Sequence, residues 1–368
     1  TSTLFALDRA DDALYAADSM IADSLKRGFA YFLHVAEITR GQLLLQMGRL
    51  DDAALMLGGR FEPHESAVTT PMDASGVVAL GRLALHTGDD PQTRQTSEIA
   101  RAMLNESAPG VRRHAAWLLS LQAAADGDPR PAHHWLCATG EPERKQLLSK
   151  LWPDTTDEAQ MVRIAVAAGD RELAESAVAD ARRRAQISPD VPSLAATAAQ
   201  ASGLLDDDVE ELARAVNLFE PSPRSLALAS AWEDLGLAQH RHESAESGTE
   251  ALTEALVLFA RAGATRDAAR LRSRLRALGI RRRVTTAEKQ ATGWVAMTKS
   301  ELAVAQLVAG GLTNREIADR LFVSPHTVNT HLRHVFAKLQ INSRVDLTRL
   351  ATERNREDIA EIARGTSR

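Results

Sequence analysis

The sequence contains little cysteine, few aromatic residues and no long apolar run. Cys137 is the single cysteine in 368 residues, so an intrachain disulfide is impossible and a disulfide-stapled secreted scaffold is excluded. A lone thiol also argues against a thiolate-based zinc site, which needs several ligands close together. No segment approaches the ~18 uninterrupted apolar residues of a membrane span, and Asp and Arg occur throughout residues 1–30. We therefore expect no membrane partner and a cytoplasmic protein.

Motifs for common enzymatic sites are also missing. Neither the phosphate-binding loop G-x-x-x-x-G-K-[ST] nor the nucleophile motif G-x-S-x-G occurs in the chain. His133-His134 and His240-x-His242 are candidate metal ligands, but adjacent histidines point to different sides of a helix, and no third ligand follows at useful spacing. The sequence predicts no enzyme, no metal and no cofactor in this chain.

The formal charge of −5 is unevenly distributed along the chain. Residues 1–269 carry 25 basic and 40 acidic side chains, a net of −15, and residues 270–368 carry 19 basic and 9 acidic side chains, a net of +10. An acidic body with a basic end is typical of a protein whose end binds nucleic acid. A basic tail that is merely solvated fits the composition equally well.

Residues 1–279 show a repeated helical pattern. Ala, Leu and Arg dominate, and alternating β-branched runs are almost absent, so helices are favoured over strands. Glycines recur at Gly48, Gly88, Gly127 and Gly169, followed at once or within a few residues by Asp. Such a glycine provides the left-handed residue that ends one helix, and the Asp caps or charges the start of the next. A period of about 34–42 residues built on such pairs is typical of an α-solenoid.

This stretch resembles tetratricopeptide repeats. Gly41, Leu44, Gly48, Ala53 and Leu57 follow that family's spacing of small and large residues, and the segment WEDLG at 232–236 matches the start of its first helix. The spacing is irregular, and Gln239 replaces an expected aromatic residue, so an irregular helical bundle is the alternative. The concave face of such an array receives a peptide, a protein partner or a small molecule. An inducer of one of these kinds is therefore expected on residues 1–279.

Residues 280–294 are expected to form a basic, polar linker, beginning at the three arginines 281–283. From Thr298 onward, the sequence predicts four short helices. Thr298 with Glu301, and Thr313 with Glu316, form capping boxes at the first two helix starts. Ser324-Pro325 caps the third helix, which runs to about Leu339, and Ser343 opens the fourth. The second and third helices therefore form a helix-turn-helix.

The run GGLTNREIADRLFVSPHTVNTHLRHVFAKLQINSR at residues 310–344 closely resembles the LuxR-type helix-turn-helix. This resemblance covers about 60 residues of the chain. It implies that residues 295–368 form a four-helix DNA-binding domain whose third helix enters the major groove, and whose fourth helix serves self-association. The whole chain is expected to be all-α, with a tetratricopeptide-like α-solenoid followed by this domain.

Two groups of side chains are candidate DNA contacts. On the third helix, the face opposite Val328, Leu332 and Val335 is suited to reading bases, because Arg pairs with guanine, Asn pairs with adenine and a Thr methyl contacts thymine. That face carries His326, Asn329, Thr330 and Arg333. Residues at helix ends are suited to phosphates, and these are Thr313, Asn314, Arg315, Ser324, Thr327, Lys338 and Arg344. Thr313 and Ser324 cap helices with or without DNA, whereas Asn329, Arg333 and Lys338 are hardest to explain without it.

The combination of repeats and a C-terminal LuxR-type domain resembles the C-terminal portion of the large ATP-binding regulators of the LuxR family. Those regulators carry an upstream nucleotide-binding domain, of which residues 1–368 show no motif. The resemblance implies a sequence-specific transcriptional regulator, expected to be an activator, whose partner is a double-stranded DNA operator. The alternative is a helical-repeat scaffold for a protein partner, in which the terminal domain serves assembly.

Overall fold

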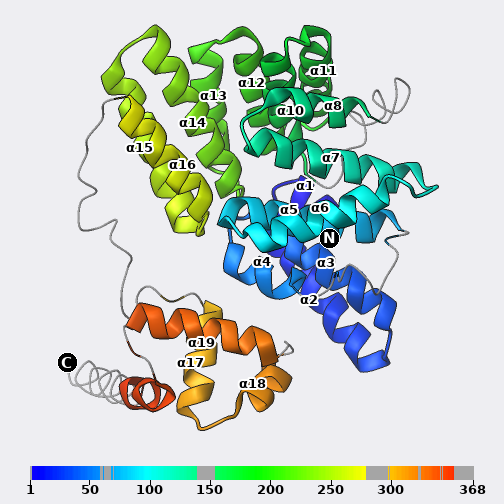
Figure 1. The fold of residues 1–368 in the computed structure, drawn as a ribbon, viewed down its shortest axis with the longest axis vertical. Coiled ribbons are helices and arrows are strands. Elements are labelled where there is room, and N and C mark those ends of the chain that lie inside the picture. Colours follow the sequence, from blue (N-terminus) through cyan, green and yellow to red (C-terminus); the bar gives the residue numbers. More distant parts are fainter. Residues whose placement is uncertain are drawn as a thin grey trace. The chain divides into compact units, whose positions relative to one another are not determined.

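The computed structural model describes residues 2–58, 61, 68, 70–138, 154–278, 297, 299–321, 325–339, 341 and 343–351. These residues form α-helices joined by short turns, and no strand occurs among them. The chain divides into two compact units, Thr1–Arg281 and Arg282–Arg368. The all-α class predicted from the sequence is confirmed (Figure 1). Pro153 and Gly279, which belong to the two residue types that most often end helices, lie outside the described residues.

Helices α1 to α16 build the N-terminal unit, mostly as consecutive antiparallel pairs (Figure 1). Their bounds are α1 Ser2–Ala6, α2 Ala10–Arg27, α3 Ala30–Gln46, α4 Leu50–Leu57, α5 Pro71–Thr87, α6 Asp90–Met103, α7 Pro109–Ala125, α8 Pro129–Cys137, α10 Asp157–Ala168, α11 Arg171–Ile187, α12 Pro192–Asp206, α13 Val209–Phe219, α14 Ser225–His242, α15 Ala245–Ala262 and α16 Thr265–Ala277.

The turns between paired helices have the predicted chemistry. Gly48, Gly88, Gly127 and Gly169 all adopt left-handed backbone, with φ between +71° and +88°. Asp residues follow three of these glycines and cap the next helix. For example, the Asp89 carboxylate accepts the backbone N–H of Gln92, the third residue of α6, at 3.0 Å. Each glycine ends one helix and each acid begins the next, as the repeat pattern predicts.

The turn between α12 and α13 has the same left-handed backbone without a glycine. Asp207 takes the left-handed conformation there, with φ +54°, which Asp tolerates better than most residues. Asp208 then caps α13 by accepting backbone N–H groups through its carboxylate. Asp208 is therefore a helix cap, although the repeat spacing in the sequence favours a small packing residue at this position.

Small residues let the paired helices pack closely. Ala53, Ala132 and Ala174 are fully buried, as the sequence pattern predicts for the residue five positions after each turn. Gly81 of α5 lies so close to α7 that a Cβ on it would be 2.5 Å from the Leu118 side chain. One continuous apolar core runs through the unit from Ile38 to Leu275.

The helical array closes on itself, which the repeat pattern does not predict. Helix α16 packs against α5, where Asp267 pairs with His86 at 2.7 Å. Near the start of α14, Arg224 donates a hydrogen bond to Gln46 at the end of α3. Asp8, just after α1, accepts the backbone N–H of Ser193 in α12. Early and late helices of the N-terminal unit are therefore in contact, and the inner sides of its helices face one another.

The C-terminal unit contains α17 (Lys299–Ala309), α18 (Asn314–Leu321), α19 (Pro325–Leu339) and a further helix over residues 344–351. These match the four predicted helices closely. Val304, Ile317, Val328, Leu332 and Leu347 belong to one buried core that joins all four. Gly311, after α17, is left-handed with φ +85°.

Within the described part of the chain, no helix combines the length and apolar character needed to span a bilayer.

Candidate nucleic-acid interface

Helix α19 has one buried and one exposed face. Val328, Leu332 and Val335 are at most 5% exposed and pack on the core. Asn329 and Arg333 lie on the opposite side, and both are exposed. The predicted orientation of these two side chains is therefore confirmed. Their amide and guanidinium groups are suited to hydrogen bonds with base edges in a major groove.

The start of α18 is held by the predicted capping box. The Thr313 backbone N–H and hydroxyl both donate to the Glu316 carboxylate, at 2.7 and 2.8 Å. The Glu316 N–H returns a bond to the Thr313 hydroxyl. The bonds from the Thr313 backbone and side chain lower the pKa of the exposed Glu316 carboxyl below its ordinary value. Thr313 thus has a structural role that does not require DNA.

Lys338 forms an ion pair inside the domain. Its ammonium donates to both carboxylate oxygens of Glu301, at 2.9 and 2.7 Å. The Glu301 side chain is fully buried, and that of Lys338 is 28% exposed. Sequence reasoning placed Glu301 in a capping box with Thr298, which lies outside the described residues. The pair joins α17 to α19 across 37 positions, so no local sequence pattern indicated it.

Arg344 also bonds within the domain. Its guanidinium donates to the Asn314 side-chain oxygen at 2.8 Å and to the Leu312 carbonyl. Asn314 and Arg344, which we predicted to contact phosphates separately, are therefore bonded to each other. Asn314 begins α18, and Arg344 begins the helix over residues 344–351. This arrangement orients the Asn314 amide, because its oxygen is occupied by the guanidinium.

The remaining predicted contacts are placed less completely. Arg315 is exposed on α18. Helix α19 contains His326, Thr327 and Thr330, whose side chains lie outside the described part of the structure, as does all of Ser324. His331, also on α19, is buried at 3% exposure. DNA contact by each of the eleven candidate residues stays a prediction.

Helices α18 and α19, with the exposed face of α19, have the arrangement of a helix-turn-helix DNA-binding domain. Residues 295–351 match the family described as bacterial regulatory proteins, luxR family. The C-terminal unit therefore carries a LuxR-type helix-turn-helix, as the sequence resemblance indicated.

The curated relatives that share this segment are bacterial regulators. An HTH-type transcriptional regulator of Mycobacterium tuberculosis is 52% identical over 67 residues, 18% of this chain and 8% of the relative. A nitrate/nitrite response regulator protein homolog of Haemophilus influenzae is 43% identical over 60 residues, 16% of this chain and 29% of its own. The oxygen regulatory protein NreC of Staphylococcus carnosus is 40% identical over 58 residues, again 16% of this chain and 27% of the relative.

These matches all cover a small share of each protein. The chain spans only 8% of the length of the mycobacterial relative and less than a third of the other two. No solved structure matches this chain. The likeness therefore concerns the DNA-binding domain.

The closed N-terminal array provides a second candidate site. It surrounds a cavity of about 860 Å³, lined by helices from α3 to α16. Leu45, Leu85, Leu121 and Phe259 contribute apolar surface to its wall. The volume lies within the ~300–1,000 Å³ typical of small-molecule sites.

Charged groups in the cavity wall occur as ion pairs. Arg163 donates to both Asp234 carboxylate oxygens, and Arg270 pairs in the same way with Glu233. These bonds with Glu233, together with the charge of Asp267, outweigh burial and raise the Arg270 pKa. The paired residues lie 37 or more positions apart, so sequence analysis missed this site. Its mixed apolar and polar wall is suited to a small organic molecule with several hydrogen-bonding groups.

Proposed function

We propose that this protein is a sequence-specific transcriptional regulator that binds a double-stranded DNA operator through α18 and α19. The observation that carries this proposal is the exposed pair Asn329 and Arg333 on α19, within a LuxR-type domain. The printed descriptions of the relatives, which are transcriptional and response regulators, support the same role.

The test is DNA selection with the full chain, followed by binding measurements on the enriched sequence. Residues 295–345 carry a net charge of +3, so one domain alone should bind weakly. Two domains making about six phosphate contacts should lose roughly a thousandfold in affinity between 50 and 200 mM salt. Absence of binding to any sequence at low salt would instead favour the scaffold function.

We further propose that the operator is bound by two or more copies. The helix over residues 344–351 exposes Val345, which is 77% exposed, and this helix is the proposed self-association element. Sedimentation of the complex should show two chains on each operator. A one-to-one complex at full affinity would contradict this stoichiometry.

Arg333→Ala should relax base preference. Loss of one bidentate contact costs about 1–3 kcal/mol at the contacted base pair, and discrimination there should fall by roughly 5- to 150-fold. The matched control is Arg320→Ala, which removes the same charge from the exposed end of α18. Competition binding with single-base operator variants measures the effect. Equal weakening on every sequence would mean that Arg333 contacts only phosphate.

We also propose that the protein is an activator controlled by a small-molecule inducer in the N-terminal cavity. The cavity volume and its mixed wall support a small molecule over a peptide or protein partner. An inducer that binds the folded array raises its unfolding temperature in proportion to the logarithm of concentration. A thermal-shift screen of polar metabolites tests this, with Arg163→Met as the cavity variant that should lose the response.

A further inference from the structure

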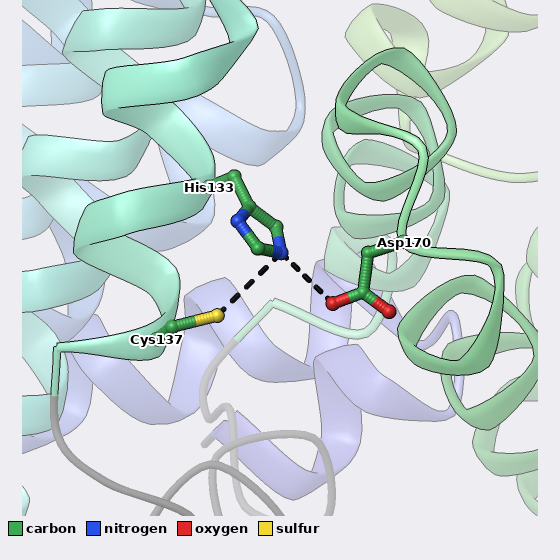
Figure 2. A group of neighbouring side chains, drawn as sticks. All are labelled: His133, Cys137 and Asp170. Carbon is green, nitrogen blue, oxygen red and sulfur yellow. Dashed lines mark hydrogen bonds and ion pairs between the residues drawn. The ribbon is translucent and has the colours of Figure 1, made fainter.

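Three potential metal-binding side chains meet between α8 and α11, outside both sites described above. His133 and Cys137 lie one helical turn apart on α8, and Asp170 is the cap of α11 (Figure 2). The His133 Nε2 atom lies 2.8 Å from Asp170 Oδ2 and 3.6 Å from Cys137 Sγ. The three donor atoms all lie within 4.8 Å of one another.

The two partners of His133 converge on a single ring nitrogen. A catalytic Cys-His-Asp arrangement uses both nitrogens of the imidazole, one toward the thiol and one toward the carboxylate. In Figure 2 both contacts run to Nε2, and Nδ1 points away from them. A neutral Nε2 either donates or accepts, so it cannot donate to Asp170 and accept from the Cys137 thiol at once. One cation placed between the three atoms accepts a lone pair from each of them.

We propose that His133, Cys137 and Asp170 bind one zinc-class divalent cation, with water in the fourth position. Zinc favours this mixture of nitrogen, sulfur and oxygen donors in tetrahedral geometry. Ideal bond lengths place the nitrogen and sulfur ~3.6 Å apart and the nitrogen and oxygen ~3.3 Å apart. The first distance is already present, and the second requires the Asp170 carboxylate to move by about half an ångström.

The surroundings of the site support an ion. One carboxylate oxygen of Asp170 accepts the Leu173 N–H at 3.0 Å, which orients the other oxygen toward His133. The His133 and Asp170 side chains are 29% and 21% exposed, so an ion can enter from solvent. A thiolate and a carboxylate neutralise the two positive charges of the ion. Binding therefore releases the Cys137 proton to solvent and ties α8 to α11.

Cobalt substitution gives a direct test on the full chain, freed of metal and kept in a non-thiol reductant. Because Cys137 is the only cysteine, a thiolate-to-cobalt charge-transfer band can come from no other residue. We expect this band, with the strong visible absorption of tetrahedral Co²⁺, at one ion per chain. Zinc should displace the cobalt, and calorimetry in two buffers should show proton release.

Variants separate metal binding from folding. Cys137→Ser should abolish the charge-transfer band and weaken zinc binding by more than ~100-fold, beyond the loss typical when a residue that only hydrogen-bonds to a ligand is replaced. Asp170→Asn keeps the helix cap and should weaken binding at least tenfold. His134→Gln alters the exposed neighbour of His133 in α8 and should change neither the charge-transfer band nor the zinc affinity. Absence of the band in the unaltered chain, or equal zinc affinity in Cys137→Ser and the unaltered chain, would overturn the proposal.

Discussion

Lys338→Met should lower the free energy of opening of the C-terminal domain. It leaves the fully buried Glu301 carboxylate without its ammonium partner, and loss of one member of a buried pair costs about 3–5 kcal/mol. Hydrogen exchange of the full chain, followed by mass spectrometry, measures the effect on α17 and α19. Amides that exchange through opening of this domain should exchange at least ~100-fold faster, since each 1.4 kcal/mol is tenfold.

The control and the rescue distinguish this effect from a loss of surface charge. Arg320→Met removes a charge from an exposed position and should leave exchange nearly unchanged. In the double variant Glu301→Met, Lys338→Met neither charge of the pair remains, so most of the protection should return. Unchanged exchange in the single variant would show that the pair contributes little.

The double variant also tests whether Lys338 contacts DNA. It keeps the net charge of the domain, because one acid and one base are removed together. If Lys338 also binds phosphate, the refolded double variant should bind the operator more weakly and with a smaller dependence on salt. If its role is confined to Glu301, affinity should match that of the unaltered chain.

Arg224→Met should weaken the closure of the N-terminal array. Arg224 is 1% exposed and lies near Asp8 and Asp154, at 3.4 and 3.6 Å. It also donates to the Gln46 side chain and the Phe5 carbonyl. Because its removal leaves the buried Asp8 carboxylate without this cation and Asp154 with Arg82 alone among the described ion-pair partners, the free energy of unfolding should fall by about 3–5 kcal/mol. Urea denaturation monitored by circular dichroism measures this, with the exposed Arg261→Met as control.

The loss in Arg224→Met should depend on pH. Burial alone would raise the pKa of the Asp154 carboxyl, but Arg82, Arg224 and the hydrogen bonds from Thr156 hold it below the ordinary value. A lowered pKa means that this carboxylate stabilises the fold above pH ~4 and that the contribution disappears as pH falls through the folded-state pKa. Without Arg224 the Asp154 pKa rises, because Arg82 is then the ion-paired cation that still lowers it, and protonation at lower pH removes part of the cost of the missing partner. The difference between variant and unaltered chain should therefore be smaller at pH 5 than at pH 7, and an equal difference would contradict this account.

The helices and their ends were largely predictable, because local residues decide them. Gly88 and Asp89 form a turn within two positions, and Thr313 and Glu316 form a capping box within four. The exposed face of α19 was predictable as well, because a helical period of 3.6 residues turns Asn329 and Arg333 away from the apolar side that carries Val328 and Leu332. The match to LuxR-type domains rests on the same short segment.

Pairings between distant side chains were not predictable. Lys338 was interpreted as a phosphate contact, since nothing in its neighbourhood indicates Glu301, 37 positions away. The histidine pair 133–134 was dismissed as a metal site because the third donor, Asp170, lies on another helix. In each case the deciding contact depends on how two helices pack.

By itself, the sequence determined an all-helical chain, the positions of its turns and a basic C-terminal helix-turn-helix, since these follow from propensity, capping and periodicity within a few residues. Only the tertiary structure decided that the helical array closes through His86 and Asp267, that a cavity opens between its helices, and that His133, Cys137 and Asp170 meet. Small differences in how each helix pair packs add up along the array. Whether its first and last helices meet is therefore set by the sum of those packings and by no single repeat.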